Sequence, residues 1–193
     1  MINHNQKNLN IDIGTRCTLQ CSECERTKRL FQGLKIPGQD MTLEQFDKLS
    51  NFFVGRQIAF CGTWSDPIFN PNFIDMLKIC KSKGVKTEVS TAASHKSIEW
   101  YESAFNANLD TRWIFGIDGL PEQSHLYRKN QDGKKLFDVM CFAKKLGINA
   151  VWQYIVFPYN LENLEKAKII AKENKLKMDI VYTTRNQNVK IKS

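Results

Sequence analysis

The chain has 193 residues, of which 42% are hydrophobic and 25% are charged, and its formal net charge is +8. This composition is typical of one folded domain with a buried core, and it excludes a disordered or fibrous protein. The sequence contains no apolar run of membrane-spanning length and no charged-then-apolar leader. We therefore expect a cytoplasmic protein without a membrane partner.

Strand-like and helix-like segments alternate along the chain. Runs rich in aliphatic and aromatic residues predict strands at 8–13, 57–61, 86–90, 113–117, 150–157 and 178–183. Amphipathic segments between them predict helices at 43–53, 73–83, 97–106, 135–146 and 161–173. Thr42 and Gln45 predict a capping box at the first of these helices, while Gly84 and Gly147 are placed to end the second and the fourth.

This alternation implies parallel strands with right-handed crossovers. We predict an α/β fold, a partial (β/α)6 TIM-like barrel open on one side, because eight units typically need about 250 residues. Residues 1–185 would form this core domain, and residues 186–193 a polar, basic tail. The loops after the strands would open onto one face, where ligands gather in such folds.

Three cysteines follow the first predicted strand, with three residues in the first gap and two in the second. They are Cys17, Cys21 and Cys24. Thiolates at this spacing can hold one soft inorganic centre, and three of them leave one coordination position open. A zinc site completed by His4 or His125 is the alternative, since structural zinc normally has four protein ligands.

The other three cysteines and the positive charge are explained by ordinary structural roles, in the core and on the surface. Cys61, Cys80 and Cys141 lie in apolar settings, so we predict that they are reduced core residues. Most lysines lie at helical spacing among apolar residues, which predicts solvated helix faces. The alternative is an anionic partner such as RNA, an acidic peptide or an acidic electron donor protein, although no RNA-binding motif accompanies the charge.

Four motifs in order resemble those of the radical S-adenosylmethionine (radical SAM) enzymes. They are the cysteine loop at 16–26, the turn Gly62-Thr63-Trp64-Ser65-Asp66-Pro67, the run Phe115-Gly116-Ile117-Asp118-Gly119-Leu120, and the run Trp152-Gln153-Tyr154-Ile155-Val156-Phe157 with Asn160. The second motif resembles the Gly-Gly-Glu-Pro turn of that family. The resemblance covers roughly residues 8 to 185 and implies the same partial barrel.

The resemblance also implies the cofactors and the residues that bind them. The three cysteines would hold a [4Fe–4S] cluster, whose open iron would chelate S-adenosylmethionine. The implied S-adenosylmethionine contacts are Gly62, Thr63, Trp64, Ser65, Asp66, Ser90, Thr91, Gly116, Asp118, Arg128, Gln153 and Ile155. Asp66 would replace the family's Glu and accept a hydrogen bond from the methionyl ammonium, unless it is only a turn residue before Pro67.

Other implied contacts replace residues that the family commonly has. Gly116 lies where relatives often have a Ser, so that contact would pass to Ser90 or Thr91. Arg128 would pair with the cofactor carboxylate, or else be an exposed loop residue. Gln153 would face the ribose or substrate, or else be a satisfied core amide. Because Glu23 replaces a common aromatic residue, the adenine contact would fall to backbone groups or to an apolar neighbour such as Ile155.

The implied reaction is reductive cleavage of S-adenosylmethionine to methionine and a 5′-deoxyadenosyl radical that abstracts hydrogen from a substrate. A flavodoxin- or ferredoxin-like protein would supply the electron. The open barrel predicts a peptide or protein substrate, or a small molecule covered by residues 27–40 as a lid. The alternatives are a glycyl-radical activase and a non-catalytic metal-binding module that contacts RNA.

Overall fold

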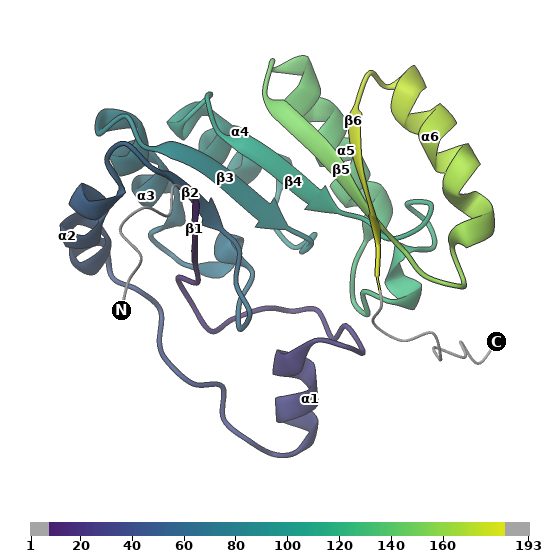
Figure 1. Ribbon diagram of the computed structural model, residues 1–193, viewed down its shortest axis with the longest axis horizontal. Coiled ribbons are helices and arrows are strands. Elements are labelled where there is room, and N and C mark those ends of the chain that lie inside the picture. The colour runs from purple at the N-terminus through teal and green to yellow at the C-terminus, as the bar shows by residue number, and fades with distance from the viewer. Residues whose placement is uncertain (1–7, 184–193) are drawn as a thin grey trace.

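The computed structural model describes residues 8–183, and its centre is one six-stranded parallel sheet (Figure 1). The strands lie side by side in chain order: β1 (Asn8–Ile11), β2 (Gln57–Phe60), β3 (Lys86–Thr91), β4 (Arg112–Gly116), β5 (Asn149–Val156) and β6 (Lys177–Tyr182). β1 and β6 are the two edges, so the sheet is open. The predicted α/β fold with an open, partial barrel is confirmed, and the predicted tail at 186–193 lies outside the described residues.

Five helices lie close to their predicted positions. They are α2 (Leu43–Phe53), α3 (Phe73–Ser82), α4 (Ile98–Ala107), α5 (Gly133–Lys145) and α6 (Leu164–Glu173). Short 3₁₀ turns cover Pro67–Phe69, Ser124–Leu126 and Leu161–Asn163, and the last of these replaces the predicted first turn of α6. None of the helices in residues 8–183 has the length and apolar character needed to cross a membrane.

The predicted helix ends have the expected local chemistry. Gln45 donates its backbone N–H to Thr42 Oγ1 at 3.2 Å, and Thr42 donates its own N–H to Gln45 Oε1 at 3.0 Å. Gly84 and Gly147 follow α3 and α5 with φ of +63° and +80°, a conformation that glycine adopts without steric cost. The capping box and both helix ends are therefore confirmed.

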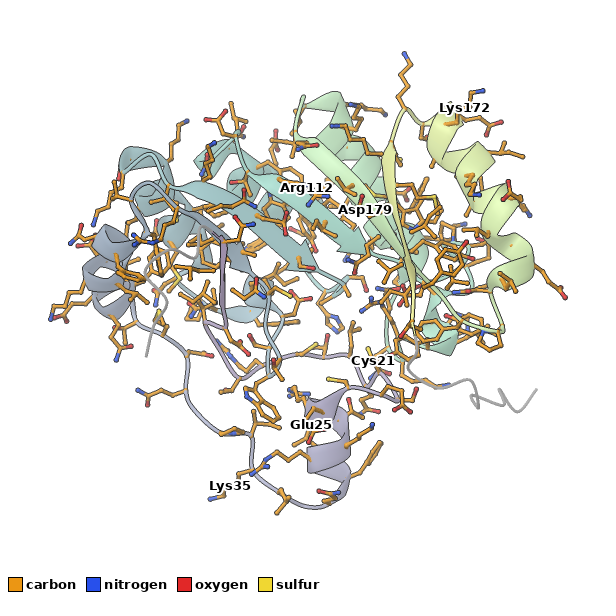
Figure 2. All side chains as sticks on the ribbon, viewed as in Figure 1. Cys21, Glu25, Lys35, Arg112, Lys172 and Asp179 are labelled. Carbon is orange, nitrogen blue, oxygen red and sulfur yellow. The ribbon has the colours of Figure 1, made fainter. Side chains whose placement is uncertain are left out.

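The two faces of the sheet differ in polarity. Side chains such as Phe60 and Trp113 are fully buried on the face that packs against helices, and the Trp113 ring lies 5.0 Å from Phe105 of α4. On the other face, Arg112 of β4 forms ion pairs with Glu88 of β3 and Asp179 of β6. Figure 2 labels Arg112 and Asp179 together on this polar face. Because successive side chains of a strand point to opposite faces of the sheet, one face belongs to the core and the other can receive polar ligands.

Helix α1 (Glu25–Phe31) was not predicted from the sequence. It has seven residues and only Thr27 is buried, so it lacks the apolar stripe by which the longer helices are recognised. α1 begins directly after Cys24 and stands apart from the other helices (Figure 1). The first part of the segment expected to act as a lid is therefore helical.

Candidate active site

A cavity of about 660 Å³ lies between the cysteine loop and the carboxyl ends of β2, β3, β4 and β5. Among the residues implied as ligands of the cluster or of S-adenosylmethionine, Asp118 alone does not line it. The lining includes Cys17, Cys21, Cys24, Gly62, Thr63, Trp64, Ser65, Asp66, Ser90, Thr91, Gly116, Arg128, Gln153 and Ile155. The parallel strand order brings together motifs that lie far apart in the sequence.

The three loop cysteines are free thiols on one wall of this cavity. Cys21 is buried, Cys17 and Cys24 are half-buried, and the Cys24 N–H donates to the Cys21 carbonyl at 3.1 Å. Burial raises the pKa of the Cys17 thiol to about 12, and it also raises that of Cys21 against the opposing effect of Arg128. Between residues 8 and 183, no three Cys, His, Asp or Glu side chains already stand in an arrangement that would hold a metal ion.

The donor set of the cavity fits an iron–sulfur cluster better than structural zinc. The three thiols of one loop suit a centre that keeps one position open, and the fourth thiol that lines the cavity, Cys61, lies outside this loop at the end of β2 with a hydrogen bond to Ser90. His125 is exposed and does not line the cavity, so it does not complete a four-ligand site. His4, the other candidate for a fourth ligand, lies outside the described residues.

The turn after β2 is held in place by Asp12, a residue that the sequence did not single out. The Asp12 carboxylate accepts hydrogen bonds from Trp64 N at 2.8 Å and from Ser65 Oγ at 2.6 Å. A Cβ on Gly62 would lie 2.5 Å from Asp12 Oδ1, so this close approach requires glycine. The one available signal was an acidic residue near the end of the first predicted strand, directly after the last residue of β1.

Asp66 has a different set of partners from the one that was expected. Its carboxylate is 6% exposed and accepts hydrogen bonds from Thr91 Oγ1, Ala92 N, Ala93 N and Ile68 N at 2.9 to 3.3 Å. Burial raises the pKa of Asp66, while these hydrogen bonds lower it. Because protein donors already occupy both oxygens, the side chain joins the turn after β2 to the loop after β3.

Arg128 and Asp118 form a buried ion pair beside the cavity. Arg128 Nε lies 2.8 Å from Asp118 Oδ2, and Ile155 N donates to Asp118 Oδ1 at 2.9 Å. Tyr159 donates its hydroxyl to the Asp118 carbonyl at 2.6 Å. Asp118 is fully buried, whereas the Arg128 guanidinium reaches the cavity. Asp118 therefore acts on the cavity indirectly, by holding Arg128 and the backbone of Ile155.

The Arg128 side chain occupies the space that a side chain at position 116 would need. A Cβ on Gly116 would lie 2.8 Å from Arg128 Nη2 and 3.0 Å from Arg128 Cζ. This close approach is the physical reason for glycine where a serine is common in the family that the motifs resemble. Of the two hydroxyls expected to replace that serine, Thr91 is engaged by Asp66, and Ser90 hydrogen-bonds to Cys61.

The prediction for Cys61 was wrong. Cys80 is buried and Cys141 packs at the edge of the core, but Cys61 is exposed and lines the cavity. Ile58 and Phe60 point into the core, so the alternation of the strand places Cys61 on the polar face. Partial desolvation within the cavity raises the pKa of the Cys61 thiol, against the opposing effect of the hydrogen bond from Ser90.

Comparison with models of known protein families gives no match, and comparison with curated protein sequences gives none either. Comparison with solved structures gives several. SuiB from Streptococcus suis bound to S-adenosylmethionine is similar to this chain with a TM-score of 0.77 and 13% identity, over 97% of this chain and 43% of that one. The protein anSMEcpe with bound AdoMet has a TM-score of 0.71 and 14% identity, over 91% and 50%.

Methylornithine synthase (PylB) has a TM-score of 0.64 and 15% identity, covering 92% of this chain and 54% of that one. These proteins are radical SAM enzymes. The chain spans about half the length of the solved proteins that it matches. At 13 to 15% identity, what this chain shares with these proteins is the fold.

Proposed function

We propose that this protein is a radical SAM enzyme whose site is the cavity between the cysteine loop and β2 to β5. The observation that carries the proposal is that the residues chosen from the motifs, Asp118 excepted, line one cavity of about 660 Å³ in a fold shared with proteins that bind S-adenosylmethionine. When bound, a [4Fe–4S] cluster would supply the electron that cleaves S-adenosylmethionine to methionine and a 5′-deoxyadenosyl radical.

The chain's own residues would bind and orient the two cofactors. Cys17, Cys21 and Cys24 would hold the cluster. Arg128 would bind the cofactor carboxylate through the guanidinium N–H groups that Asp118 leaves free, because Asp118 engages Nε. The methionyl ammonium would then find its acceptors among the backbone carbonyls of the turn at 62–65, since the Asp66 carboxylate is already saturated by protein donors.

The wall formed by β5 would contact the rest of the cofactor or the substrate. Gln153 and Ile155 are both half-buried on the cavity side of that strand. Ile155 offers apolar area to the adenine, and Gln153 offers an amide to the ribose or the substrate. Excluding water and stray hydrogen donors from this space is the protein's further contribution to radical chemistry.

A peptide or protein is the substrate class that the surroundings of the site favour. The sheet is open between β1 and β6, so a chain can approach its polar face. Two similar structures were solved with peptides, SuiB with the precursor peptide SuiA and anSMEcpe with the Cp18Cys peptide. A small molecule covered by residues 27–40 remains the other candidate from the sequence.

The test is anaerobic reconstitution with iron and sulfide, followed by dithionite and S-adenosylmethionine. We expect about four irons and four sulfides per chain, a broad visible absorption band and slow release of 5′-deoxyadenosine without substrate. A colourless, air-stable protein with one zinc per chain would contradict the proposal and favour the non-catalytic metal-binding module. Formation of a glycyl radical on an added partner enzyme would favour the activase alternative.

A further inference from the structure

The outer side of α1 and the turn after it form an apolar patch ringed by positive charge. Its members, called the α1 patch below, are Arg29, Leu30, Phe31, Leu34 and Lys35. Phe31 is 78% exposed, more than any other large hydrophobic residue in the described part of the chain, and Leu30 and Leu34 are each 44% exposed. Exposed apolar groups concentrated in this way mark an interaction surface.

The charge around this patch is strongly one-sided. Arg29 and Lys35 are basic, and no member of the patch is acidic. Residues 25–36 have a net charge of +3, and one of the positive charges counted there, on Lys28, is paired with Glu23 at 2.8 Å. Arg29 is fixed in place, because its Nε donates to the Lys35 carbonyl at 2.8 Å and its guanidinium carbon lies 5.9 Å from the centre of the Trp64 ring. A second copy of the chain would bring like charges together in a symmetric contact, so the charge favours an acidic partner.

The position of the patch indicates what kind of protein would bind there. Phe31 comes seven residues after Cys24 on a helix that begins there, which is about 10 Å along the helix axis. Glu25 and Lys28 of α1 line the cavity, whereas the members of the α1 patch do not. A protein on this patch therefore comes close to the cysteine loop without entering the cavity. An electron donor must come close to the cluster ligands without filling the cavity, whereas a substrate must enter the cavity.

We propose that the α1 patch is the docking surface for a small acidic electron donor protein of the flavodoxin type. This inference rests on the proposed function. In the electron transfer step, the anionic flavin hydroquinone of the donor loses one electron and becomes the neutral semiquinone. A cluster held by Cys17, Cys21 and Cys24 would accept that electron, and no proton or covalent bond would change place.

The experiment uses purified flavodoxin with the cluster-loaded protein, and two variants of the patch. Phe31→Ser removes the apolar centre, and Lys35→Glu reverses the charge of the rim. Ile169→Ser and Lys172→Glu are the matched controls on α6, because Ile169 is 58% exposed and Lys172 is exposed at a distance from Cys21 (Figure 2). Binding of oxidised flavodoxin is measured by calorimetry, and reduction of the cluster by reduced flavodoxin is measured by stopped-flow absorbance.

Each patch variant should weaken flavodoxin binding and slow the reduction by about tenfold at low ionic strength, while the controls stay at the wild-type values. Added salt should reduce the difference between Lys35→Glu and the wild type, because exposed charges are screened. Dithionite, which needs no docking surface, should reduce every variant equally and give the same release of 5′-deoxyadenosine.

The possible failures are distinguishable. If dithionite yields no 5′-deoxyadenosine from the wild type, the proposed function is wrong. If dithionite works and flavodoxin binds and reduces the patch variants as it does the wild type, the docking surface is wrong and the function stands. Dimerisation lost in Phe31→Ser, a precursor-type peptide competing for the patch, or single-stranded RNA binding there in place of flavodoxin would also overturn the proposal.

Discussion

Gly116 and Arg128 fit together so closely that a Cβ on residue 116 would lie 2.8 Å from the guanidinium Nη2. We predict that Gly116→Ala displaces Arg128 and lowers the free energy of unfolding by about 1–3 kcal/mol, the usual cost of overpacking. Arg128→Ala should cost about 3–5 kcal/mol, because it leaves the Asp118 carboxylate buried without its partner. Chemical denaturation of the single and double variants measures both costs.

The double variant distinguishes a direct contact from two independent effects. Once Arg128 is removed, the added methyl group at 116 has no guanidinium to displace, so Gly116→Ala should then cost much less. Strictly additive costs would show that the two residues do not compete for the same space.

Replacement of Arg128 by lysine should affect the cofactor more than the fold. Lys keeps a positive charge opposite Asp118 but loses the planar fork that can bind a carboxylate through two N–H groups. We expect Arg128→Lys to keep its iron and to bind S-adenosylmethionine about tenfold more weakly, as measured by equilibrium dialysis. Unchanged affinity would remove Arg128 from the cofactor site.

The Asp66 carboxylate gives a test between a positioning role and a direct cofactor contact. An amide at this position has one oxygen fewer to accept from Thr91, Ala92 and Ala93, so Asp66→Asn should lower the free energy of unfolding by about 1–3 kcal/mol. Thermal unfolding of the protein without cofactors measures this cost, with Asp110→Asn at an exposed site as control. Full stability together with lost S-adenosylmethionine binding would restore the direct contact that the motif suggested.

Asp12 should be needed for the turn after β2 and not for metal binding. Asp12→Ala leaves Trp64 N and Ser65 Oγ without their acceptor, at a cost of about 1–2 kcal/mol. The variant should retain the iron content of the wild type and bind S-adenosylmethionine more weakly. Normal binding would show that the turn keeps its shape without this carboxylate.

The six cysteines should divide into two groups on iron analysis. Cys17→Ala, Cys21→Ala and Cys24→Ala should each abolish the cluster, because each removes one of three ligands. The matched variants Cys61→Ala, Cys80→Ala and Cys141→Ala should keep about four irons per chain. Cys61 makes this a stringent comparison, since its thiol lines the same cavity as the three ligands. Loss of iron in Cys61→Ala would add a fourth cysteine to the ligand set.

Local chemistry made most of the fold predictable from the sequence. Buried residues recur every two positions in β2 and about every 3.6 positions in α2, so both patterns depend on residues close together in the chain. The capping box at Thr42 likewise involves residues three positions apart. Helix α1 was not predicted, because a short helix with one buried residue shows no such repeat of apolar residues.

The site was predictable only as a set of residues, without their contacts. Motif order along parallel strands was enough to place the cysteines and Arg128 around one cavity. The hydrogen bonds from Trp64 to Asp12 and from Ala92 to Asp66 were not predictable, because each joins residues more than twenty positions apart in the chain. Cys61 was assigned to the core from its apolar neighbours, whereas the end of β2 turns it to the open face.

The order of the strands also determines when the site comes into being during synthesis. Each strand pairs with the one made before it, so the sheet can grow by one unit at a time as the chain leaves the ribosome. Cys17, Cys21 and Cys24 emerge well before Gln153 and Ile155, which line the same cavity. The cavity around the nascent thiols is therefore incomplete while β2 to β4 are being made, and the walls that would shelter a bound cluster are complete only once β5 has joined the sheet.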